Sequence, residues 1–173
     1  SKDMLANINV EGQPVPCIRF MGGREYEMIC SLTNCSSDQI VNDDDIKQII
    51  VDGVMALPSF SKGNGPYGKN RSEILGIPKN GAALATIYCA LMISCCLNKL
   101  NTQGDVIMDG SFLKNPILCR LVAQLCGKKN LYISNDVAGT VKGAAQLTQW
   151  SQSPTLELEK CEPYNVEGLD LYL

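Results

Sequence analysis

The pattern of apolar and polar positions predicts short strands and helices that follow one another closely. Strands are expected where apolar residues alternate or cluster briefly, and helices where they recur every three or four positions. Strands are predicted over residues 5–10, 15–20, 105–108 and 131–134, and helices over residues 24–32, 43–55, 80–100, 115–126 and 140–150. The turn composition of Glu11-Gly12-Gln13-Pro14 predicts that the first two strands form a hairpin.

The order of these elements predicts an α/β domain, in which a mixed sheet is flanked by helices. A hairpin and helices come first, and strand and helix then alternate, which is typical of parallel strands joined by helical crossovers. Residues 1–150 are taken as this domain. Residues 151–173 are polar and predict a surface tail with little regular structure.

Residues 81–97 form the most apolar run in the chain. This run is marginal in length for a membrane span, and Thr86 and Ser94 interrupt it. A helix buried between the layers of a soluble domain explains the run better, and no membrane is expected as a partner.

The amino-acid composition further limits the classes of function that the chain could have. The chain has 173 residues with 45% hydrophobic and 19% charged residues and a net charge of -3, so it should fold and has no excess of basic residues for nucleic acid. Its nine cysteines lie mostly in apolar helical stretches, and it has no histidine. Buried thiols in a reducing, cytoplasmic protein are therefore expected, and a zinc site is not.

A glycine-rich segment, Gly63-Asn64-Gly65-Pro66-Tyr67-Gly68-Lys69-Asn70, matches two phosphate-binding patterns literally. Pro66 removes a backbone N–H that such a loop would direct at phosphate, and Asn70 stands where a P-loop needs Ser or Thr. Neither a good strand before nor a good helix after is predicted. A glycine-rich surface loop is the expected structure.

The segment Asp109-Gly110-Ser111-Phe112-Leu113-Lys114-Asn115-Pro116 has the better context, since a strand precedes it and a helix follows it. Ligands commonly bind at the carboxyl ends of such strands. Gly110 would allow close backbone approach, and Ser111 and Asn115 would offer hydrogen-bonding groups. An ordinary β–α turn with Ser111 or Asn115 as the N-cap explains the same residues.

Three segments together resemble one family. Phe-Met-Gly-Gly-Arg-Glu-Tyr-Glu at 20–27, the segment at 109–116, and Gly-Thr-Val-Lys-Gly-Ala-Ala at 139–145 are similar to the C-terminal domain of FGGY carbohydrate kinases. The resemblance implies a ribonuclease-H-like domain of the actin-like ATPase superfamily. It also implies that ATP lies in a cleft with its adenine against this domain, and that the parent protein is a sugar kinase.

The resemblance also implies a set of nucleotide-binding residues. Gly23 and Glu27 would flank the nucleotide, and Gly110, Ser111 and Asn115 belong to the segment similar to the family's adenosine-binding signature. Asn115 matches the adenine-contacting Asn of the family member glycerol kinase. Ser111 stands where that enzyme has Gly, which adds a side chain beside the base.

The family's catalytic Asp, its first phosphate loop and its sugar site belong to an N-terminal domain, and a Gly-Thr strand would precede this chain. Asp109 and Asp136 are therefore not assigned as the general base, and no catalytic or metal-binding residue is assigned. Mg²⁺ and sugar would be held mainly by the missing half, and the fragment alone is predicted to be inactive. The identity of the sugar cannot be predicted.

Two other functions compete with this one. The first is a non-catalytic nucleotide-binding or oligomerisation module, for example a homodimer. The second is a Rossmann-type dinucleotide enzyme built on residues 105–136, which lacks a glycine fingerprint at its β–α turn.

Overall fold

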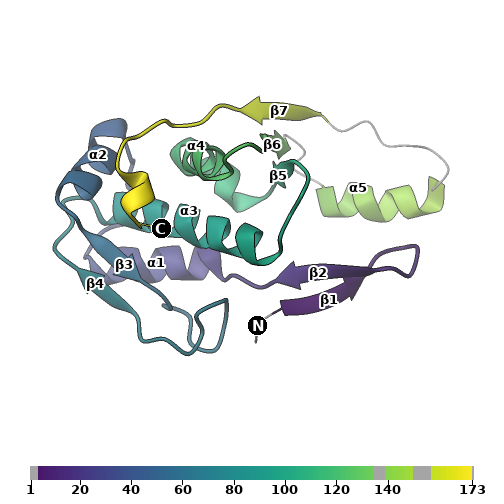
Figure 1. Cartoon of the computed structure of the whole chain (residues 1–173), viewed down its shortest axis with the longest axis horizontal. Helices are drawn as coiled ribbons and strands as arrows, with labels where there is room; N and C mark the ends of the chain where they lie inside the picture. The colour runs from purple at the N-terminus through teal and green to yellow at the C-terminus, as the bar shows by residue number, and fades with distance from the viewer. Residues whose placement is uncertain (1–3, 135–138, 150–156, 173) are drawn as a thin grey trace.

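The computed structural model describes residues 4–134, 139–149 and 157–172 (Figure 1). The strands are β1 Met4–Ile8, β2 Pro14–Ile18, β3 Met55–Leu57, β4 Glu73–Leu75, β5 Val106–Met108, β6 Leu131–Ser134 and β7 Leu158–Cys161. The α-helices are α1 Gly22–Leu32, α2 Asp43–Val51, α3 Gly81–Lys99, α4 Pro116–Leu125 and α5 Gly139–Gln146. Short 3-10 helices are η1 Ser111–Lys114, η2 Leu147–Gln149 and η3 Leu169–Tyr172.

The strands form three separate sheets. β1 and β2 make the predicted antiparallel hairpin, and β3 pairs with β4 in a second one. In the third sheet β6 pairs parallel with β5 and antiparallel with β7. This sheet is mixed, as predicted, because α4 carries the chain back from β5 to a parallel β6.

Helix α3 lies at the centre of the molecule, where it packs against α1, α2 and α4 (Figure 1). Its N-cap Asn80 accepts hydrogen bonds from the backbone N–H groups of Ala82 at 3.0 Å and Ala83 at 3.2 Å. The helix is long and apolar enough to cross a membrane, but 72% of its most apolar window is buried inside the domain. The structure therefore supports the predicted core helix.

Helix α2 begins with a capping box, but it ends earlier than predicted. The Asn42 side chain accepts from Asp45 N, and the Asp45 carboxylate accepts from Asn42 N, both at 3.0 Å, which makes a capping box. The helix ends at Val51 rather than at Met55. Gly53 follows with a φ of +64°, a left-handed conformation that suits a helix terminus, and Met55 then begins β3.

The prediction for the end of the chain was wrong in its described part. Instead of a tail with little regular structure, β7 extends the third sheet and η3 packs against the core. Leu169 is buried, and the Tyr172 hydroxyl donates to the carbonyls of Ile49 at 3.0 Å and Val54 at 3.2 Å. A free sheet edge and a few apolar side chains were enough to order this segment. The boundary at residue 150 itself stays a prediction.

The glycine-rich segment at 63–70 lies in the connection between β3 and β4, a hairpin that was not predicted. A strand follows it rather than a helix, so it lacks the context of a P-loop. The connection is also less superficial than expected, because Phe60 is 4% exposed and belongs to the hydrophobic core.

Candidate functional site

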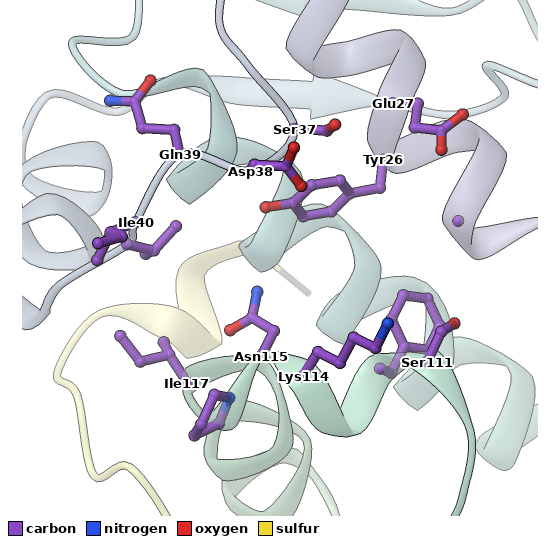
Figure 2. A pocket seen from close by; sticks show the side chains of 14 residues that line it. Tyr26, Glu27, Ser37, Asp38, Gln39, Ile40, Ser111, Lys114, Asn115 and Ile117 are labelled. Carbon is purple, nitrogen blue, oxygen red and sulfur yellow. The ribbon is translucent and has the colours of Figure 1, made fainter.

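A cavity of about 470 Å³ opens between α1, the loop before α2, and the junction of η1 with α4 (Figure 2). One side, which we call the helical wall, consists of Gly23, Tyr26 and Glu27 together with residues 111–117 except Leu113. The other side, which we call the loop wall, consists of residues 37–41. The helical wall contains both segments that the sequence singled out around positions 20–27 and 109–116.

Four of the five predicted nucleotide-binding residues line this cavity, namely Gly23, Glu27, Ser111 and Asn115. Gly110 lies next to it but is not among the lining residues. It has a φ of +89° and a ψ of −153°, a conformation that is essentially restricted to glycine. The turn itself therefore requires glycine at position 110. The ligand-binding roles of all five predicted residues stay predictions.

Close packing explains why two segments far apart in the sequence meet here. A Cβ atom placed on Gly22 would lie 2.4 Å from Cζ of Phe112. Only a glycine at this position lets the first turn of α1 approach the aromatic ring of η1 so closely. The motif at 20–27 therefore provides a contact surface as well as cavity lining.

Asn115 has two structural bonds in addition to its place in the cavity. Its Oδ1 accepts from the backbone N–H of Leu118 at 3.1 Å, so it caps α4, and Pro116 follows at the first helical position. Its Nδ2 donates to Oγ1 of Thr86 on α3 at 2.9 Å. The two interpretations of Asn115, as an N-cap and as a site residue, are therefore compatible.

The loop wall was not predicted as part of a site. Nδ2 of Asn80 donates to the carbonyl of Ile40 at 3.3 Å and so ties this loop to the N-terminus of α3. The Cys35 thiol donates to Oε1 of Gln39 at 2.7 Å. No motif marks these positions in the sequence, because the contact from Asn80 to Ile40 spans forty residues.

Tyr26 and Lys114 are further lining residues that sequence reasoning missed as site residues. Figure 2 shows the Tyr26 ring and the Asn115 amide facing each other across the cavity. Burial raises the pKa of Tyr26 to about 12, partly offset by a hydrogen bond with Thr86, so its hydroxyl stays neutral near pH 7. In the sequence Tyr26 lies within the segment 20–27, but no role was assigned to it.

Glu25 lies beneath the helical wall and is 1% exposed. Its Oε2 accepts from the Tyr88 hydroxyl on α3 and from the backbone N–H of Phe60, the latter at 3.3 Å. Its Oε1 has no hydrogen-bond partner among the described residues. Burial raises the pKa of this carboxyl, and the bonds from Tyr88 and Phe60 oppose that rise. Glu25 thus joins α1, α3 and the connection after β3.

Within residues 4–134, 139–149 and 157–172, no group of three or more His, Cys, Asp or Glu side chains could hold a metal ion. Asp136, set aside above as a candidate base, lies outside the described residues. Asp109 is exposed at the end of β5, where its Oδ1 accepts from the N–H of Gly110 at 2.7 Å.

Comparisons with known proteins agree with this architecture. The sequence matches the family described as carbohydrate kinase FGGY, C-terminal domain, over residues 1–156. A similar solved structure is that of a carbohydrate kinase from Novosphingobium aromaticivorans, with a TM-score of 0.82 and 28% sequence identity. That match covers 99% of this chain and 38% of the kinase. A search of curated proteins gave no match. The chain belongs to the FGGY carbohydrate kinase family, whose C-terminal domain with its ribonuclease-H-like fold it represents.

Proposed function

We propose that this chain is the nucleotide-binding half of a sugar kinase and that the cavity holds the adenosine part of ATP. The observation that carries the proposal is that four residues predicted from two separate sequence segments line one cavity: Gly23, Glu27, Ser111 and Asn115. Its volume of about 470 Å³ is in the usual range for a small-molecule site. Asn115 offers an amide of the kind that pairs with adenine.

The charges at the cavity favour the nucleoside over the phosphates. Lys114 is the one basic residue on the lining, and Glu27 and Asp38 are acidic. Because this balance does not favour a triphosphate, we place the phosphates beyond the cavity, toward the N-terminal domain of a complete kinase. The transfer of the γ-phosphoryl group, the sugar, Mg²⁺ and the catalytic base are assigned to that other half.

Two further properties belong to this proposal. All nine cysteines are unpaired, which supports a reducing, cytoplasmic location. Because one half alone lacks the acceptor base and the phosphate loops, purified 1–173 should not phosphorylate sugars. Phosphorylation of a sugar by the purified chain, with ATP and Mg²⁺, would contradict the assignment of the base to the other half.

The test is calorimetric titration with ADP. We expect weak binding, on the order of 0.1 mM, from about 0.3 kcal/mol per non-hydrogen atom of the adenosine part. Gly23→Leu should weaken it about tenfold or more, because its side chain would enter the cavity. A Cβ at Gly23 meets nothing within 4 Å, so this substitution should not disturb the fold.

Gly143→Leu is the matched control. Gly143 is also an exposed helical glycine with nothing within 4 Å of its Cβ, and it does not line the cavity. The Gly143→Leu variant should bind ADP as tightly as the wild type does. Equal losses in both variants, or no binding of ADP by the wild type, would overturn the proposed site.

A further inference from the structure

Thr86, in the middle of α3, lies behind the cavity and connects three helices. Its side chain is completely buried. Its hydroxyl donates to the carbonyl of Ala82 at 2.8 Å and accepts from Nδ2 of Asn115 at 2.9 Å, and it also shares a hydrogen bond with Tyr26. A threonine hydroxyl has one donor and two acceptor positions, so the bonds to Ala82 and Asn115 use its only donor and one of its acceptors.

This arrangement fixes which way the Asn115 amide points. Its oxygen faces the N–H of Leu118, and its nitrogen faces Thr86. A flipped amide would set its NH₂ against the Leu118 N–H, and its oxygen against a Thr86 hydroxyl whose proton is already given to Ala82. Both contacts would be lost, and the buried N–H of Leu118 would be left without a partner. The Leu118 N–H and the Thr86 hydroxyl together therefore favour one orientation of the amide.

In this orientation Asn115 has one Nδ2 hydrogen and one Oδ1 lone pair left over after the bonds described. Asn115 is among the residues that line the cavity. A donor and an acceptor side by side on one amide match adenine, which presents N7 as an acceptor beside the N6 amino donor. Guanine presents two acceptors, N7 and O6, on the same edge and cannot satisfy both atoms of the amide.

We propose that Thr86 is a positioning residue that holds the Asn115 amide in the orientation that selects adenine over guanine. The proposal rests on the proposed function, because it concerns the same cavity. Thr86 does not itself line the cavity. Its effect on the ligand passes through Asn115, with Tyr26 holding it from the opposite side.

The experiment compares ADP and GDP binding to residues 1–173 by calorimetry, in the wild type, Thr86→Val and Thr86→Ser. The wild type should bind ADP more tightly than GDP by roughly 5- to 150-fold, the effect of one bidentate amide–base pair. Thr86→Val keeps the shape of the side chain but lacks the hydroxyl. The ratio of its Kd for GDP to its Kd for ADP should therefore fall toward 1. Thr86→Ser restores the hydroxyl and should keep the ratio within about twofold of the wild type.

Tyr26→Phe provides a second route if Thr86→Val does not fold. It removes the hydroxyl that shares a hydrogen bond with Thr86 from a half-buried ring, and it should lower the ratio less than Thr86→Val. An unchanged ratio in folded Thr86→Val, or in Tyr26→Phe when the first variant fails to fold, would overturn the positioning role alone. Absence of ADP binding in the wild type would instead overturn the proposed function and this inference together.

Discussion

The two walls of the cavity are attached to the same helix, α3, in different ways. The helical wall is joined to the middle of α3 through Thr86, and Phe112 packs directly on Gly22. The loop wall is tied to the N-terminus of α3 by a hydrogen bond from Asn80 to the carbonyl of Ile40, and Val41 packs against the core, but the Ile40 side chain is 84% exposed. We infer that core packing fixes the helical wall, while the loop wall, whose residues 37–40 are exposed, has fewer packing contacts and can adjust to a ligand.

We expect the largest loss of stability from a substitution in α3, the helix that supports both walls. Ile87→Ala, in the core next to Thr86, should lower the free energy of unfolding by about 2–5 kcal/mol because Ile87 is 1% exposed. Urea denaturation followed by circular dichroism measures this change. Ile77→Ala is the matched control, since Ile77 is 89% exposed and should change stability by less than about 0.5 kcal/mol. Similar losses in both variants would show that α3 is not the common support.

A smaller effect should separate the walls. Asn80→Ala removes both the cap of α3 and the bond to Ile40, and should cost about 0.5–2 kcal/mol. Asn80→Ser keeps a capping oxygen but lacks the Nδ2 donor, so it should recover most of that stability. Both variants should exchange the backbone amides of residues 37–41 faster, as measured by hydrogen exchange. Unchanged exchange in the loop wall would show that the Asn80 bond does not hold it.

The difference between the walls also explains what the sequence could predict. The helical wall comes from local signals, a pair of glycines at the start of α1 and a strand–turn–helix at 109–116, and the family resemblance joined them. The contact between Gly22 and Phe112 that brings them together could not be predicted, because it depends on the packing of distant elements.

The loop wall had no such signal. Its hydrogen bond to α3, from Asn80 to Ile40, spans forty residues and uses a backbone carbonyl that any residue could supply. The same reason applies to β7, which pairs with β6 far earlier in the chain, and to the short strands β3 and β4. Short strands are defined by their partners more than by their own composition.

We expect the smallest change in thermal stability from Glu25→Gln near pH 5, and this change should grow as the pH rises. Because burial raises the pKa of Glu25 above its ordinary value of 4.5, the folded chain holds a proton here that the unfolded chain has already released. Wild-type stability from this group therefore falls as pH rises from about 4.5 through the raised pKa, and then levels off. Gln stays neutral and can still accept a bond from Tyr88, so Glu25→Gln should lack this fall.

Thermal unfolding from pH 4.5 to 8 measures the effect as the Tm of the variant minus that of the wild type. The difference should increase with pH in favour of Glu25→Gln. Glu27→Gln, an exposed substitution on the same helix, should change Tm little at any pH. Parallel profiles for Glu25→Gln and the wild type would mean that the carboxyl beneath the helical wall does not titrate differently on folding. A rising difference would make the helical wall sensitive to pH through a buried group, in contrast to the loop wall, where the one titratable side chain, Asp38, is exposed.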